Sequence, residues 1–251
     1  MAENNECIIL IPGIGGFPEF HRDLIVKLNG KDKRKVTTSP HGDSNAKPYY
    51  SLDQHVAYWS GFIKKEVEKG EGEVHLIGIS FGAAIAISLP MDVLSGIKNI
   101  ILVSPPHLPM FSRIILRVSR IFHSSITSKL LGKFILWWSE RKVDDVELLR
   151  EQRNQLYDDY SLVYVRLWNR LISLLDMSSL TEFIQNDLRP KVGIVYAKDE
   201  YAYALSPFNK FHVSFALNKA EHIVIPGDHS ASIRMSNPLA SAIDKLMGGT
   251  A

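Results

Sequence analysis

Residues 74–84 read VHLIGISFGAA, and within them Gly78-Ile79-Ser80-Phe81-Gly82 forms a G-x-S-x-G pattern. An apolar stretch typical of a buried strand leads into the pattern, and a helix of small residues is expected to follow it. A tight turn from strand to helix holds a serine hydroxyl clear of the backbone, and the flanking glycines leave room for the strand and helix that meet there. The pattern predicts that Ser80 is a nucleophile, and the alternative is a turn whose hydroxyl is only structural.

A nucleophilic serine needs a base, and the base needs an acid that orients it. The β-branched stretch 191–197 (KVGIVYA) is expected to be a strand, and the carboxylates of KDE (198–200) follow its end. The apolar stretch 222–225 (HIVI) is expected to be another strand, and PGDH (226–229) places an imidazole in the turn after it. The chain thus supplies nucleophile, acid and base in the order Ser80, Asp199, His229.

Other side chains compete for these roles. Glu200 and Asp228 are alternative acids, but a carboxylate directly before a histidine rarely reaches its neighbour's Nδ1, which disfavours Asp228. His107 follows a strand end and could approach the same site. The remaining histidines show neither an i, i+4 pair with an acid between nor a cysteine partner, so we expect no metal site. His75 and His222 lie on expected strands, and we expect them to be structural.

With these motifs the chain resembles the α/β-hydrolase superfamily, whose members use the order Ser, acid, His, with each residue in a loop after a parallel strand. The matching motifs are GISFG, YAKDE and PGDHS, and the resemblance covers most of the chain. Glu200 is one position past the family's usual place for the acid, which favours Asp199. No cofactor is expected.

A fourth match lies near the start, where the expected strand 7–11 (CIILI) precedes the glycine-rich stretch 12–17 (PGIGGF). This stretch looks like the family's oxyanion loop. The resemblance therefore assigns the two N–H donors of an oxyanion hole to Ile14 and Phe81. The chain departs from many relatives at Pro12, where they carry histidine, but the backbone role can survive that change. Phosphate binding is disfavoured, because GIGG lacks the full dinucleotide spacing and the lysine of a P-loop.

Composition agrees with one compact enzyme. A chain of 251 residues with 45% hydrophobic content can bury a large core, and the formal charge of +2 is too small to argue for nucleic acid. The single cysteine, Cys7, cannot form an internal disulfide. The first residues, MAENNE, do not read as a signal peptide, and no apolar run reaches the roughly 18 residues of a membrane span. We expect a cytoplasmic protein without stable membrane insertion, and its oligomeric state is open.

Apolar strand patterns alternate with helical patterns along most of the chain, which predicts an α/β fold with a mostly parallel six-stranded sheet and helices on both faces. We expect the chain to lack the opening strand pair that larger members of the family carry. The strands are expected at 7–11, 35–38, 73–78, 98–103, 191–197 and 222–226. Helices are expected at 20–29, at 52–69 with a Ser51/Gln54 capping box, and at 238–247 with Asn237 as its cap.

The stretch 105–188 lacks a convincing strand and is far longer than a crossover needs. We expect it to be a helical cap over the carboxyl ends of the strands, with 1–104 and 189–251 forming the core domain. Seven Lys/Arg against one acid between 111 and 142 make a membrane-surface role conceivable, but a solvated face balanced by later acids is the simpler interpretation. Apolar stripes in the cap favour an apolar acyl substrate.

Together these features predict hydrolysis of a carboxylic ester of a small or medium, largely apolar substrate, through an acyl-enzyme on Ser80. The same residues serve thioesterases, C–C bond hydrolases and lyases in the superfamily, so these remain alternatives. A ligand receptor of the same fold with slow turnover is a further alternative.

Overall fold

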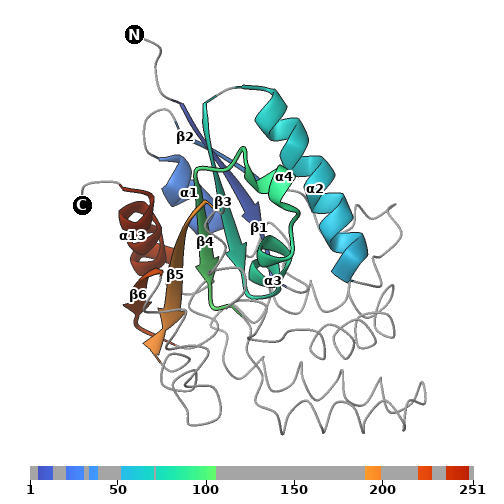
Figure 1. The fold of residues 1–251 in the computed structure, drawn as a ribbon. Helices are drawn as coiled ribbons and strands as arrows, with labels where there is room; N and C mark the ends of the chain where they lie inside the picture. Colours follow the sequence, from blue (N-terminus) through green and yellow to red (C-terminus); the bar gives the residue numbers. More distant parts are fainter. Residues whose placement is uncertain are drawn as a thin grey trace, which may run out of the picture.

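The computed structural model describes residues 5–13, 21–30, 34–38, 52–70, 72–105, 190–198, 220–227 and 236–248. They form one six-stranded sheet in the order β2-β1-β3-β4-β5-β6, and all five strand pairs are parallel (Figure 1). The strands are β1 Glu6–Ile11, β2 Arg34–Thr38, β3 Glu73–Ile79, β4 Asn99–Val103, β5 Lys191–Ala197 and β6 Glu221–Ile225. The expected strands agree with these bounds to within one residue at each end, and the sheet is wholly rather than mostly parallel.

Helices cover both faces of this sheet (Figure 1). On one face lie α2 (Leu52–Glu68), α3 (Phe81–Ile87) and α4 (Met91–Leu94), whose apolar side chains share a core cluster with Cys7, Ile9 and Leu76. On the other lie α1 (Arg22–Asn29) and α13 (Ser236–Met247), which pack on the alternate residues of the same strands. Successive side chains along each strand therefore point alternately into two separate apolar layers.

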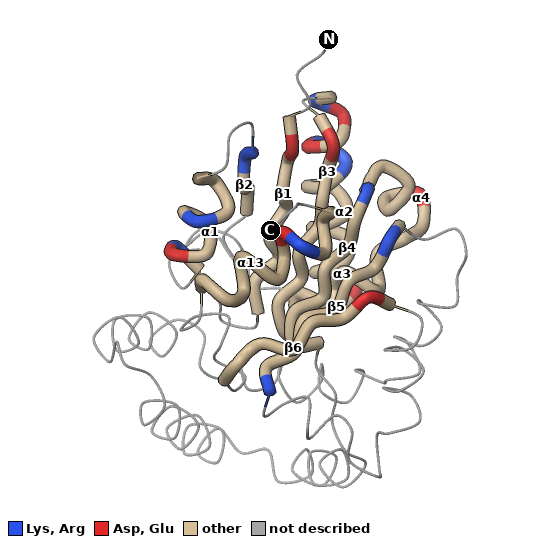
Figure 2. The backbone as a smooth tube through the Cα atoms, turned by 90° about the vertical axis from the view of Figure 1, so that its left-hand side faces the viewer, with Lys and Arg blue, Asp and Glu red and all other residues tan. Residues whose placement is uncertain are grey.

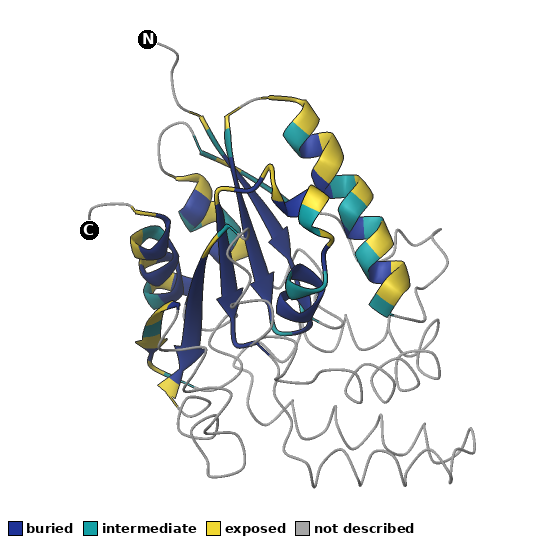
Figure 3. Cartoon of the chain, in the orientation of Figure 1, coloured by how far each residue is buried: buried dark blue, intermediate teal, exposed yellow. Residues whose placement is uncertain are grey.

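The four inner strands are buried along almost their whole length, whereas β2 and β6 at the edges are only partly covered (Figure 3). This explains why the inner strands read as nearly continuous Ile, Leu and Val, as strands buried on both faces do. Edge position also explains His222, which is exposed on β6 rather than buried, whereas His75 on the inner strand β3 is fully buried.

The last helix begins at Ser236, two residues earlier than expected, so Asn237 lies inside the helix and does not precede it as a cap. Pro238 is accommodated because the first-turn amides of a helix have no intrahelical acceptor to lose. The helix ends before Gly248, whose φ of +92° suits a residue without a side chain. The Ser51 end of the expected capping box lies outside the described residues.

The predicted cap, apart from Pro105, also lies outside the described residues, so the division into core and cap stays a prediction. Among the described helices, none is both long and apolar enough to span a membrane.

Candidate active site

Ser80 occupies the corner between β3 and α3, in a backbone conformation that side-chain-bearing residues rarely adopt. Its φ and ψ are 51° and −112°, and strained dihedrals of this kind concentrate at functional sites. The corner is fixed on both sides: the Ser80 amide donates to the Val103 carbonyl at 2.8 Å, and the Ser80 carbonyl accepts from the Ala83 amide at 2.9 Å. Ser80 is half-buried at the carboxyl edge of the sheet.

The two glycines of the pattern are required by close backbone contacts. A Cβ at Gly78 would lie 2.6 Å from the Gly82 carbonyl oxygen and 2.7 Å from the Ala83 Cα, so the incoming strand touches the outgoing helix. A Cβ at Gly82 would lie 2.1 Å from the Ile11 carbonyl oxygen. Gly78 makes room where the incoming strand β3 meets the outgoing helix α3, as the pattern predicts. Gly82 makes room for the neighbouring strand β1 and not for β3.

The chain that follows β1 lies directly beside the nucleophile candidate. A Cβ built on Gly13 would lie 3.4 Å from the Ser80 Cβ and 3.9 Å from its Oγ. Gly13, at the start of the glycine-rich stretch, therefore lies against Ser80. Ile14, the expected donor within it, lies outside the described residues.

Phe81, the other expected oxyanion donor, is the first residue of α3 and its side chain is buried. Its ring packs edge to face against His55 of α2, with centroids 5.1 Å apart and an interplanar angle of 84°. Such pairs favour one ring orientation. The contact ties the residue after Ser80 to α2, and no sequence motif pointed to His55.

The expected acid and base lie just past the described parts of two further strands. The described chain after β5 stops at Lys198, one residue before Asp199, and that after β6 stops at Gly227, two before His229. The competing residues Glu200, Asp228 and His107 lie outside the described residues as well. Because β3, β4, β5 and β6 are consecutive and parallel, the chain leaves β5 and β6 at the same edge of the sheet as Ser80.

Sequence reasoning missed a second strained corner. Ser104, at the end of β4, has a φ of 47°, and its amide donates to the Val195 carbonyl at 2.8 Å. It is buried between the strand that carries Ser80 and the strand that leads toward Asp199. Serine gives no sequence signal for a positive φ, as glycine does, so this corner could not be found from the residue type.

Ser80 is a strained serine at a strand-to-helix corner, on the carboxyl edge of a parallel α/β sheet. This geometry is that of the class of proteins with a nucleophile elbow. A family model described as the alpha/beta hydrolase family matches residues 8–242, and the chain belongs to that family.

Solved structures share this fold over nearly the whole chain. A lipase-esterase related protein from Clostridium acetobutylicum superposes with a TM-score of 0.69 at 15% identity, covering 97% of this chain and 95% of that chain. MenH from S. aureus gives 0.66 at 16% identity, with 98% and 95% covered. The enol-lactonase from Burkholderia xenovorans LB400 gives 0.66 at 12% identity, with 98% and 92% covered. No curated protein sequence matches the chain significantly.

Proposed function

We propose that this hydrolase cleaves carboxylic esters of small or medium, largely apolar substrates through an acyl-enzyme on Ser80. The observation that carries the proposal is the Ser80 corner itself: a half-buried serine with a φ of 51° at the carboxyl edge of the sheet. The Gly13 backbone beside its Oγ supports the same conclusion, because the donors of an oxyanion hole must lie close to the nucleophile.

In the proposed reaction, Ser80 Oγ attacks the ester carbonyl carbon while His229 accepts the hydroxyl proton. Asp199 holds the imidazole in the tautomer that can accept that proton, and the Phe81 and Ile14 amides stabilise the oxyanion. The tetrahedral intermediate expels the alcohol, which takes the proton from His229. Water, activated by the same histidine, then releases the acid and restores Ser80. Each oxyanion donor lowers the barrier by about 3–4 kcal/mol.

The substrate class rests on the apolar stripes of the proposed cap, residues 105–188. An apolar lining above a polar reaction centre binds acyl or aromatic groups in preference to sugars. The lipase-esterase related protein and the enol-lactonase share the fold, and their names are consistent with an ester-type substrate.

A series of p-nitrophenyl esters of increasing chain length tests the proposal, together with labelling by a fluorophosphonate. We expect a burst of p-nitrophenol equal to the enzyme concentration or steady turnover, and a label on Ser80. Preference for short chains indicates a small pocket. Absence of both ester turnover and label in the folded protein rejects the proposal.

The same assays separate the alternatives on this triad. Faster turnover of thioesters than of matched oxygen esters indicates a thioesterase. Carbon–carbon cleavage without an acyl-enzyme burst indicates a C–C hydrolase or a lyase. One slow turnover with covalent retention of the product indicates a ligand receptor.

A further inference from the structure

Charged residues mark the amino end of every strand, at the edge of the sheet opposite Ser80 (Figure 2). In sheet order they are Arg34, Glu6, Glu73, Lys98, Lys191 and Glu221, of which Lys98 directly precedes β4. Neighbours of opposite sign form ion pairs: Arg34 with Glu6 at 2.6 Å, Lys98 with Glu73 at 2.5 Å, and Lys191 with Glu221 at 3.2 Å. This order of charges along the sheet places the carboxylates of two neighbouring strands, β1 and β3, side by side.

These two carboxylates belong to Glu6 and Glu73, which are direct register partners on β1 and β3. Like charges in directly opposed positions destabilise a strand pair. Arg34 contacts Oε2 of Glu6, and Lys98 contacts Oε2 of Glu73. Arg34 also divides its charge between Glu6 and Asp244 of α13. These contacts fall on Oε2, which leaves Oε1 of each glutamate as the oxygen that a further ligand would contact.

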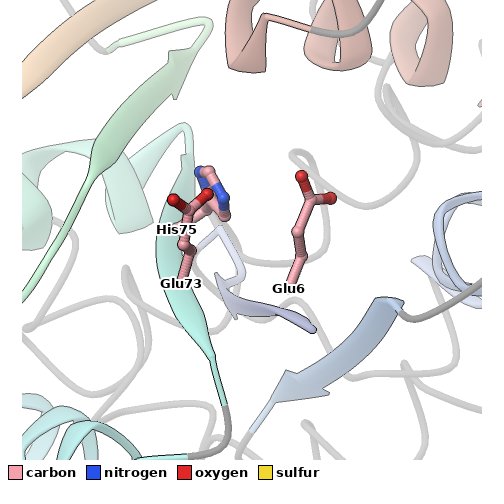
Figure 4. Close-up of side chains that lie close together, drawn as sticks. All are labelled: Glu6, Glu73 and His75. Atoms are coloured by element: carbon pink, nitrogen blue, oxygen red, sulfur yellow. The ribbon is translucent and has the colours of Figure 1, made fainter. Parts of the chain in front are cut away.

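A buried imidazole completes the cluster. His75 follows Glu73 by two residues, so both side chains lie on the same face of β3. His75 is 0% exposed, and its Nε2 is buried without a hydrogen-bond partner among the described residues. A ring nitrogen and one oxygen from each carboxylate all lie within 4.8 Å of one another, and Figure 4 shows the imidazole beside Glu73 with Glu6 across from it.

One neutral imidazole and two carboxylates are a donor set that suits Zn²⁺, whereas Mg²⁺ and Ca²⁺ take oxygen ligands. The Asn99 side-chain Nδ2 lies 3.0 Å from the His75 Nδ1. Rotation of that amide lets its oxygen accept from Nδ1–H, as in many metal sites, and leaves the Nε2 lone pair for the ion.

We propose that Glu6, Glu73 and His75 bind a divalent transition-metal ion, with Zn²⁺ the best match, between β1 and β3. His75 precedes Ser80 by five residues, which at about 3.3 Å per strand residue is roughly 16 Å. At that distance the ion stabilises the sheet and takes no part in ester cleavage. Side-chain exposures of 32% for Glu6 and 37% for Glu73 leave room for water as a fourth ligand. These residues form no metal-binding motif along the sequence, because strand register brings together ligands from two strands.

Zn²⁺ added to the metal-free, full-length protein tests the site by calorimetry and thermal unfolding. We expect saturable binding of one ion and a rise in Tm of roughly 5–10 °C at a hundredfold excess of zinc over Kd. Glu73→Gln should weaken binding about tenfold or more. Glu221→Gln is the matched control, since Glu221 is also a partly exposed carboxylate at a strand start paired with a lysine, and it should leave binding unchanged.

Lys98→Met supplies a test in the opposite direction. It removes the ammonium that competes for Glu73, so zinc should bind more tightly than to the wild type. Co²⁺ should give visible absorption in the wild-type protein that is lost in Glu73→Gln. Absence of zinc binding, or equal weakening by Glu73→Gln and Glu221→Gln, overturns the proposal and leaves the cluster as a network of ion pairs. Either result is independent of ester hydrolysis, because none of these residues lies at the Ser80 edge.

Discussion

The amide nitrogen of Ser80 donates a 2.8 Å hydrogen bond to the carbonyl oxygen of Val103, the last residue of β4. The Ser104 amide repeats this relationship one strand farther on, with the Val195 carbonyl of β5 as acceptor. Ser80 and Ser104 are the non-glycine residues with positive φ in the described part of the chain. Each strained corner is therefore held by the next strand of the sheet, and the backbone of the nucleophile candidate is fixed before any substrate binds.

Ser80→Ala should lower kcat for ester hydrolysis by about 10⁴-fold or more, because loss of the nucleophile removes the covalent route. Steady-state kinetics with a p-nitrophenyl ester measure the loss. Ser88→Ala is the control, since the Ser88 hydroxyl only donates to the Ala84 carbonyl of α3 at 2.8 Å, and it should keep turnover near the wild-type rate. Near-normal turnover by a folded Ser80→Ala protein would reject Ser80 as the nucleophile.

Gly82→Ala should destabilise the protein by about 1–3 kcal/mol or more, because its Cβ would lie 2.1 Å from the Ile11 carbonyl oxygen. Gly61→Ala is the matched change in an exposed part of α2, where a Cβ meets nothing within 4 Å. It should raise stability by about 0.5–1 kcal/mol through helix propensity. Urea unfolding measures both, and equal effects would show that the corner tolerates a side chain.

Asp199→Asn should cost on the order of 10⁴ in kcat, because an amide at that position favours the wrong histidine tautomer. Glu200→Gln removes the neighbouring carboxylate and should cost far less. Kinetics with the same ester compare the two variants. The opposite ranking would move the acid to Glu200.

With His229 as the base, kcat/KM should rise with pH through an apparent pKa near ~6.5, as the imidazole loses its proton and becomes able to accept that of Ser80. His229→Ala should abolish this rise together with fluorophosphonate labelling. Labelling rates across pH 5–9 check both statements. Loss of labelling on a change at His107 or His222, with His229→Ala unaffected, would overturn the assignment.

The buried His75 should make stability depend on pH. Burial lowers its pKa below the ~6.5 of the unfolded chain; Glu6 and Glu73 oppose the shift, and Lys98 and Arg34 add to it. The unfolded chain therefore binds the proton more readily, and the free energy of unfolding falls as pH drops below ~6.5 toward the folded-state pKa. Urea unfolding between pH 5.5 and 8 with a chelator present measures this slope. His75→Gln should flatten it, and an unchanged slope would remove His75 as its source.

Most of the sheet could be predicted because its inner strands are short, apolar and bounded by turn residues. The start of α13 could not be predicted from the sequence. Proline is common as the first residue of a helix, so Pro238 indicated a start there, but a helix can begin up to a turn before a proline, and α13 begins at Ser236. Local pattern also failed to show that β6 is an edge strand with exposed His222, because strand order depends on long-range pairing.

At the site, sequence pattern found Ser80 and its two glycines, because a G-x-S-x-G corner needs each residue at a fixed offset. It did not find the His55 contact with Phe81 or the Glu6, Glu73 and His75 cluster. Those residues come together through helix packing and strand register, and neither leaves a fixed spacing along the chain. The catalytic roles of Ser80, Asp199, His229, Ile14 and Phe81 stay predictions.

The position of α13 bears on how the protein is made. This helix contributes Leu239, Ile243 and Leu246 to the apolar layer over β4 and β5, and Gly193 of β5 approaches Leu246 so closely that a Cβ would lie 2.9 Å from it. During synthesis the chain reaches α13 only after all six strands of the sheet. The part of the apolar layer that α13 covers therefore stays open to water until residues 236–247 have left the ribosome, and apolar surface exposed in this way favours aggregation.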